Sequence, residues 1–276
     1  MAKDSLILNN KTMIQIEKII RDLHLVRKKS PLIHNITNFV VMNNTANAIL
    51  AVGASPVMAH SSDEVAAMAA IASSLVINIG TLEAAWVESM LIAGKTALEN
   101  SVPVIFDPVG AGATPYRSEI SREIIEVCKP SIIRGNASEI MALDDRNACT
   151  KGVDSVHSSD AALEAAKALA LQSGAVVVVS GARDYITDGN RVETVDNGNP
   201  MMSRVTGMGC TATAIVATFA AINRDYLEAA THGMYIMGIT GEIAALMSKG
   251  NGSLQMNFLD VLFNLGEDEI KKNIKL

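Results

Sequence analysis

The segment Val205–Ala214, VTGMGCTATA, places two glycines and a cysteine directly before a helical pattern. Gly207 and Gly209 allow the backbone to turn tightly, and the free N–H groups at a helix start attract anions. This pattern favours binding of an oxyanion or a phosphoryl group. The lysine of a Walker A loop is absent, so the turn is not a P-loop. Close helix packing also selects glycine, and both interpretations remain open.

Cys210 lies at the start of that predicted helix. There the helix dipole lowers a thiol pKa and favours the thiolate, so the side chain could act as a base or a nucleophile. The alternative is a small, buried, inert thiol. No spacing selects one of the five histidines as a partner. The sequence therefore does not support nucleophilic catalysis.

Polar residues also follow three apolar runs. Asp107 precedes a glycine-rich loop and could hold Mg²⁺, accept a proton or cap a turn. Arg134 could contact a phosphate, while Glu139 could order Mg²⁺ through water or form a capping box with Asn136; these two interpretations are compatible. Ser180, before a glycine, could receive a nucleotide. In an open parallel sheet such strand ends share the ligand-binding edge.

Apolar runs alternate with helical patterns along the chain, which predicts an α/β fold with a mainly parallel sheet and one domain over residues 1–276. Asp188-Gly189-Asn190 joins two short runs in a hairpin pattern. The predicted strands are 55–58, 75–79, 104–107, 132–134, 176–179, 185–187 and 191–195. The predicted helices include 13–28, 39–50 ended by Gly53, a helix to Ile71 with Asp63 and Glu64 in its first turn, 82–99, 210–222, 226–247 and 254–265.

Charge and composition exclude several classes of protein. The 276 residues carry 23 Lys and Arg against 29 Asp and Glu, a net charge of −6, with 49% hydrophobic residues. This excludes a disordered chain, and the absence of a basic block argues against binding to nucleic acid or to an anionic membrane. Three cysteines, Cys128, Cys149 and Cys210, show no CxxC spacing. With no signal-peptide pattern, they favour a cytoplasmic protein.

The stretch from Ser30 to Ser62 contains no Asp, Glu, Lys or Arg in 33 residues. Five asparagines and two histidines in it would each need an internal partner in lipid, which argues against a membrane span. We interpret it as a buried wall of a soluble protein.

Six segments in order, PLIHNITNFVVMNNTANAILAVGASPVMA, INIGTL, IFDPVGAGATPYR, IIRGNASEI, VVVVSG and VTGMGCTATA, strongly resemble the hydroxyethylthiazole kinase family. The resemblance covers about residues 30–222. It implies a ribokinase-like three-layer αβα fold without a separate lid domain. It also implies transfer of the ATP γ-phosphate to the alcohol of the thiazole precursor of thiamine, and a homotrimer with active sites at subunit interfaces.

By this resemblance each candidate residue has a role. An anion hole and catalytic corner would be formed by Gly207, Met208, Gly209 and Cys210. Asn38, Val40, Thr45, Met58 and Gly207 would bind the thiazole. ATP would be contacted by Arg134, Asn136 and Ser180, and Mg²⁺ by Asp107 and Glu139. Wider ribokinase-like enzymes carry an aspartate at the position of Cys210, so the thiol leaves the strength of base catalysis open.

Two other functions remain open. One is a related kinase for another vitamin alcohol, such as hydroxymethylpyrimidine or pyridoxine; the uncharged, Asn-rich stretch and GMGC favour the thiazole. The other is a nucleotide-binding regulatory protein that performs no chemistry. Asp107 and Glu139 favour an enzyme, because such a protein would not need carboxylates beside phosphates. The uncharged stretch is then a pocket wall for a neutral heterocycle that also packs against a neighbouring subunit.

Overall fold

The apolar runs of the sequence form the centre of a single sheet in the computed structural model. The model describes residues 2–144 and 158–276, with side chains from 13–144 and 160–276; Cys149 lies outside these residues. Within the described residues the strands lie in the order β2-β1-β3-β4-β5-β6-β7-β8. All neighbours from β2 to β6 are parallel, and β6-β7 and β7-β8 are antiparallel. The mainly parallel sheet and the hairpin are thus confirmed.

The strands are short, as buried parallel strands usually are. They are β1 (Leu32–Ile36), β2 (Ser55–Val57), β3 (Ser74–Asn78), β4 (Val104–Asp107), β5 (Ile132–Asn136), β6 (Val176–Ser180), β7 (Asp184–Thr187) and β8 (Val192–Val195). Continuous burial of β3 and β4 explains why they read as apolar runs rather than as alternating patterns.

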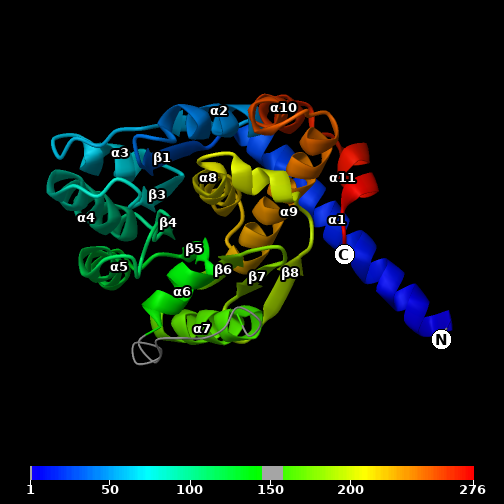
Figure 1. Cartoon of the computed structure of the whole chain (residues 1–276), viewed down its shortest axis with the longest axis horizontal. Coiled ribbons are helices and arrows are strands. Elements are labelled where there is room, and N and C mark those ends of the chain that lie inside the picture. The colour runs from blue at the N-terminus through cyan, green and yellow to red at the C-terminus, as the bar shows by residue number, and fades with distance from the viewer. Residues whose placement is uncertain (1, 145–157) are drawn as a thin grey trace.

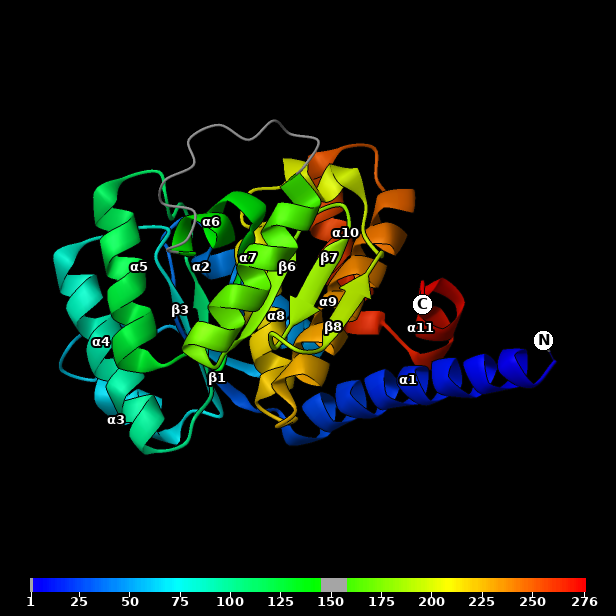
Figure 2. The ribbon, with the colours of Figure 1, turned by 90° about the horizontal axis from the view of Figure 1, so that it is seen from below.

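Helices cover both faces of the sheet. On one face lie α3 (Val65–Ile71), α4 (Ala84–Glu99), α5 (Pro115–Cys128), α6 (Ala137–Leu143) and α7 (Ser158–Ser173). The other face is covered by α1 (Ala2–Lys29), α2 (Met42–Val52), α8 (Met208–Ala220), α9 (Tyr226–Leu246) and α10 (Asn251–Asn264), with α11 (Glu267–Asn273) beside α1 (Figure 1). These are the three expected layers. The N-terminal part of α1 extends away from the sheet (Figure 2).

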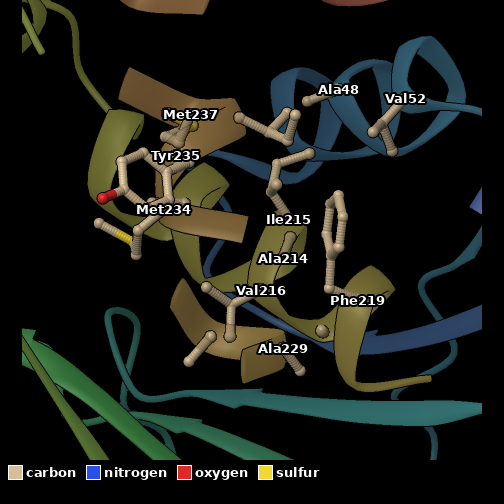
Figure 3. Packing of buried hydrophobic residues seen from close by; sticks show 14 of the residues in the cluster. Ala48, Val52, Ala214, Ile215, Val216, Phe219, Ala229, Met234, Tyr235 and Met237 are labelled. Carbon is tan, nitrogen blue, oxygen red and sulfur yellow. The ribbon is translucent and has the colours of Figure 1, made fainter. Parts of the chain in front are cut away.

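Two apolar cores result, one on each face, because successive side chains of a strand point to opposite faces. Val76 belongs to the core under α8, whereas its neighbours Leu75 and Ile77 belong to the opposite core. Figure 3 shows the first core where α2, α8 and α9 meet, with Phe219 fully buried between them. Helix α8 is buried along nearly its whole length, so it is a rigid central element.

Three details of the sequence prediction were wrong. Helix α2 starts at Met42 rather than at Phe39, because Asn38–Val41 form the turn that leaves β1. Helix α3 starts after Glu64, so Asp63 and Glu64 are not in its first turn. The short elements η2 (Pro200–Arg204), a 3-10 helix, and α11 were not predicted. Gly53 does end α2, in a left-handed conformation with φ of 103°.

No helix among the described residues combines the length and the apolar character needed to cross a membrane. This agrees with the interpretation of the uncharged stretch as buried wall: it forms β1, α2 and β2.

Candidate active site

The polar residues singled out in the sequence gather at the carboxyl edge of the sheet. Asn78, Asp107 and Ser180 end β3, β4 and β6, and Arg134 lies near the end of β5. Helix α8 packs on β3 and β4, with its first residues at this same edge. The edge therefore combines carboxylates, amides, a guanidinium and the N-terminus of a helix.

Asp107 is the most deeply buried acid at this edge, with 1% of its surface exposed. Its Oδ2 accepts hydrogen bonds from Asn78 Nδ2 at 2.8 Å and from the Thr213 hydroxyl at 2.7 Å. Burial raises the pKa of Asp107 to about 6, although Arg134 and both hydrogen bonds act in the opposite direction and Glu139 adds to the rise. A cation beside this carboxylate would relieve the cost of its buried charge.

Asn78 connects Asp107 to the start of the uncharged wall. Its Oδ1 accepts a hydrogen bond from Asn38 Nδ2 at 2.9 Å and another from the N–H of Gly80. Asn38 Nδ2 also lies 3.4 Å from the sulfur of Cys210. A chain of hydrogen bonds thus runs from Asp107 through Asn78 and Asn38 to Cys210. Two of the predicted site residues, Asn38 and Cys210, are in contact.

Of the two interpretations of Cys210, the structure favours the neutral thiol over the thiolate. Burial and the negative charge of Asp107 raise the pKa of the Cys210 thiol, despite hydrogen bonds from Asn78 and Asn38 and the charge of Arg134. Burial thus acts against the thiolate that the start of a helix would favour. Cys210 is a neutral thiol in contact with Asn38, and it lies on the surface of the site rather than fully inside the core.

Arg134 and Ser180 lie side by side on β5 and β6, where Arg134 Nη2 donates to the Ser180 hydroxyl at 2.7 Å. Both line a cavity of about 470 Å³ together with Asp184, Asn197, Met208 and Gly209. Arg134 is only 8% exposed, and its buried Nε has no hydrogen-bond partner among the described residues. A buried cation with a spare donor at a cavity is suited to an anion.

The first turn of α8 faces this cation. A Cβ at Gly209 would lie 3.1 Å from Arg134 Nη1, so the guanidinium packs directly on that turn. Gly207 caps the helix in a left-handed conformation with φ of 80°, and a Cβ there would lie 2.5 Å from Val41 Cγ1. Glycine is therefore required at Gly207 by its backbone and by its contact with the uncharged wall.

Glu139 and Asn136 form the capping box expected from the sequence, which is confirmed. Glu139 Oε2 accepts from the N–H of Asn136 at 2.8 Å, and its Oε1 accepts from the N–H of Gly110 at 2.9 Å. Glu139 thus ties the glycine-rich loop after β4 to the start of α6. Asn136 is not among the residues that line the cavity; its role toward ATP stays a prediction.

The remaining predicted thiazole ligands lie on or beside the uncharged wall. Val40 is 71% exposed in the turn before α2, and Met58 follows β2. Thr45 is buried in α2, and its hydroxyl has no partner among the described residues. Their contact with a substrate stays a prediction.

The sequence analysis missed three residues that organise this edge. Asn78 and Thr213 hold Asp107, and Arg117 donates to the carbonyl oxygens of Ile79, Gly80 and Val109, which joins the loops after β3 and β4. A polar residue at the end of an otherwise apolar strand was the available signal for Asn78. Arg117 and Thr213 lie on helices, where the sequence gives no such signal.

The edge also suits a magnesium ion that is shared with phosphates. Within the part of the chain that the structure describes, no three acidic, histidine or cysteine side chains form a metal cluster. Mg²⁺ at phosphate sites commonly takes only one or two carboxylates. Asp107 and Glu139, close enough for Glu139 to raise the pKa of Asp107, fit that requirement.

The fold is ribokinase-like. A ribokinase-like protein from Enterococcus faecalis V583 shares the fold, with a TM-score of 0.61, 14% identity and coverage of 86% of this chain and 87% of that one. The hydroxyethylthiazole kinase family model matches residues 23–268, and the chain belongs to that family. It is therefore an enzyme, as the sequence analysis predicted.

Curated relatives and a solved structure are similar to this chain over most of their length. A hydroxyethylthiazole kinase from Nitratidesulfovibrio vulgaris (strain DP4) is 53% identical over 91% of this chain and 94% of its own. A hydroxyethylthiazole kinase from Vibrio atlanticus (strain LGP32) is 51% identical, over 94% of this chain and 98% of its own. The solved structure of hydroxyethylthiazole kinase protein from Pyrococcus horikoshii OT3 has a TM-score of 0.87 at 40% identity, covering 94% of this chain and 98% of that one.

Proposed function

We propose that the chain transfers the γ-phosphoryl group of ATP to the primary alcohol of hydroxyethylthiazole, which yields the phosphate used for thiamine. The observation that carries this proposal is the position of Arg134: a buried guanidinium with an unpartnered Nε, beside Ser180 and the first turn of α8, on a cavity of about 470 Å³. This arrangement supports binding of a nucleotide whose terminal phosphate reaches the helix N-terminus.

The alcohol would approach from the opposite end of the same edge. Asn38 touches Cys210, and Val41 touches Gly207, so the uncharged wall meets the first turn of α8. A neutral heterocycle placed against Asn38, Val40, Thr45 and Met58 would carry its hydroxyl to that turn. Lack of charge in this wall favours a neutral ring.

In the transfer, the bond between the γ-phosphorus and the β-bridging oxygen breaks while the alcohol oxygen bonds to phosphorus in line. Arg134 and the N–H groups of Gly207, Gly209 and Cys210 at the start of α8 hold the phosphoryl oxygens as their charge shifts. Bound Mg²⁺, held by Asp107 and Glu139, would neutralise phosphate charge. Asn38 orients the alcohol, and ADP leaves. The proton of the hydroxyl passes late to an oxygen of the transferred phosphoryl group, because such transition states need little deprotonation of the nucleophile.

The neutral thiol of Cys210 leads to a testable expectation. Cys210→Ala keeps measurable activity, because a thiol with a raised pKa supplies little base catalysis at neutral pH. Cys210→Asp is at least as active as the unchanged enzyme, because a carboxylate accepts the proton more readily. The measurement is kcat with hydroxyethylthiazole at saturating ATP. A folded but inactive Cys210→Asp enzyme would show that this position does not accept a proton.

Glu139→Gln lowers kcat and raises the Mg²⁺ concentration needed for half-maximal rate. The amide keeps the shape of the side chain but removes the charge that would order the ion, and its NH₂ group can no longer accept from one of the two backbone N–H groups of Gly110 and Asn136. The check is a Mg²⁺ titration of the initial rate. Ser138→Ala is the matched control, since the Ser138 hydroxyl donates only to the Asn136 cap. A Mg²⁺ dependence equal to that of the unchanged enzyme would remove Glu139 from the metal site.

The proposed function itself is tested by release of ADP with each of three alcohols: hydroxyethylthiazole, hydroxymethylpyrimidine and pyridoxine. We expect strong stimulation by hydroxyethylthiazole and little by the other two. Stimulation by another alcohol alone would identify a related kinase. ATP binding without stimulation by any of them would favour the regulatory protein.

The proposal also covers the oligomeric state and the cellular location of the enzyme. We expect residues 1–276 to act as one kinase domain and three copies to form a ring with sites between subunits. Exposed Phe39 and Val40 beside the site support this, because apolar side chains there gain from a neighbour. Phe39 also packs on Trp86, with ring centroids 4.7 Å apart. Light scattering that gives the mass of a monomer would contradict the trimer. A cytoplasmic location stays a prediction.

A further inference from the structure

The loop that joins β8 to η2 forms one wall of the cavity described above. Asn197, Gly198 and Asn199 of the loop and Pro200, the first residue of η2, line it together with Arg134 and Ser180. Loops of this kind move easily unless other elements hold them. Two elements form hydrogen bonds with this loop: helix α9 and the segment Asn273–Lys275, which starts at the last residue of α11.

Helix α9 approaches the loop closely because it presents glycines there. A Cβ at Gly238 would lie 2.4 Å from the carbonyl oxygen of Asn197, so only glycine fits without displacing the loop. Glu242 lies one turn further along α9, and its Oε1 accepts a hydrogen bond from the N–H of Gly198 at 2.7 Å. Its Oε2 accepts Asn197 Nδ2 at 3.1 Å.

The segment Asn273–Lys275 closes the arrangement from the other side. Asn197 Nδ2 donates to the carbonyl oxygen of Asn273 at 2.8 Å, and the N–H of Lys275 donates to Asn197 Oδ1 at 3.0 Å. Lys275 Nζ forms an ion pair with Glu242 Oε1 at 2.6 Å. The hydroxyl of Tyr235 lies 3.3 and 3.4 Å from the carbonyl oxygens of Thr194 and Lys275, between β8 and this segment.

Asn197 is the centre of this network. It is only 5% exposed, and both its amide nitrogen and its amide oxygen are hydrogen-bonded. Asn197 and its neighbours line the cavity, and its side chain joins α9 to the segment 273–275. That segment lies beyond residues 23–268, which the family model matches.

We propose that Asn197, Glu242 and the segment Asn273–Lys275 form a clasp that fixes the wall of the nucleotide cavity and thereby sets the affinity of the enzyme for ATP. This rests on the proposed function, in which that cavity holds ATP. The clasp residues are positioning residues. A wall held in its binding conformation before ATP arrives loses less conformational freedom when ATP binds.

The test separates the affinity for ATP from that for the alcohol. Asn197→Asp keeps the shape of the side chain but replaces its two donors by a carboxylate facing Glu242. We expect the KM for ATP to rise about tenfold, with the KM for hydroxyethylthiazole and kcat at saturating ATP within about twofold. Lys275→Met, which removes only the ion pair, raises the KM for ATP by roughly threefold. Asn264→Asp is the matched control, because Asn264 Nδ2 donates to a backbone carbonyl on exposed α10.

Equal KM values for ATP in the unchanged, Asn197→Asp and Lys275→Met enzymes would overturn the clasp, and so would parallel rises in both KM values. If Asn197→Asp does not fold, Lys275→Met and Tyr235→Phe carry the test with the same criteria. Calorimetric titration with ATP separates the two proposals. Normal ATP binding without phosphorylation by the unchanged chain defeats the proposed function, while weaker ATP binding by the variants still supports the clasp.

Discussion

Arg134→Met lowers kcat/KM for ATP by roughly 10²- to 10³-fold, and the KM for hydroxyethylthiazole stays within about threefold. Methionine keeps the apolar stem of the side chain but removes the guanidinium, which packs on the first turn of α8. The donors lost are the one to Ser180, which lines the cavity, and the buried Nε, which has no partner among the described residues. Because the change also removes the positive charge that lowers the pKa of the buried Asp107 and Asp184, the melting temperature of the variant is measured first to show that it is folded.

Arg224→Met is the matched control for this change. Arg224 follows the far end of α8, where its Nη1 donates to the carbonyl oxygen of Ser101 and lies near the hydroxyl of Tyr226. We expect this variant to keep kcat/KM for ATP within about twofold. An Arg134→Met enzyme whose ATP kinetics match those of the control would remove Arg134 from the nucleotide site and leave the proposed function without its main support.

Asp107→Asn lowers kcat by roughly 10²- to 10³-fold at saturating ATP and Mg²⁺, since the carboxylate charge that would hold the ion is lost. The amide oxygen can still accept from Asn78 and Thr213, so the loss reports the charge rather than the shape. Asp260→Asn, on an exposed part of α10, is the control and keeps full activity. An active Asp107→Asn enzyme with unchanged Mg²⁺ dependence would contradict the assignment.

Asp107→Asn is also expected to raise the melting temperature of the enzyme by a few degrees at pH 8, measured in EDTA so that no metal ion is bound. The pKa of Asp107 is about 6 in the folded chain and near its ordinary 3.8 in the unfolded one. Ionisation of Asp107 therefore destabilises the folded protein. This destabilisation is absent below pH 3.8, increases as the pH rises from 3.8 to about 6, and reaches its full size above pH 6. The amide of the Asp107→Asn variant does not titrate, so the gain at pH 8 must exceed the gain at pH 5. A variant that melts below the unchanged enzyme at pH 8 would disprove this account.

Much of the fold could be predicted because its signals are local. Buried strands such as β3 and β6 are apolar without interruption, and Gly53 and the box of Asn136 and Glu139 mark helix ends through their own backbone. The short elements η2 and α11 escaped prediction. Both are only a turn or two long and are held by distant residues, such as α11 beside α1.

The candidate residues were predictable because strand ends meet at one edge, but their chemistry depends on neighbours that are distant in sequence. The pKa of Cys210 is raised by burial and by the negative charge of Asp107 on β4, and neither effect can be recognised from the position of Cys210 at the start of a helix. Asn197 shows the same limit. Its partners Glu242 and Lys275 follow it by 45 and 78 residues, so no pattern in the sequence connects them.

The order of the strands also bears on how the enzyme could be engineered. The residues proposed for the alcohol lie at and beside β1 and β2, whereas those proposed for the nucleotide lie on β5, β6 and the loop after β8, with β3 and β4 between them. A library that varies Val40 and Met58 could therefore explore new alcohols while the nucleotide side is left intact. Val41 should be left unchanged in such a library, because its contact with Gly207 joins the alcohol side of the site to the first turn of α8.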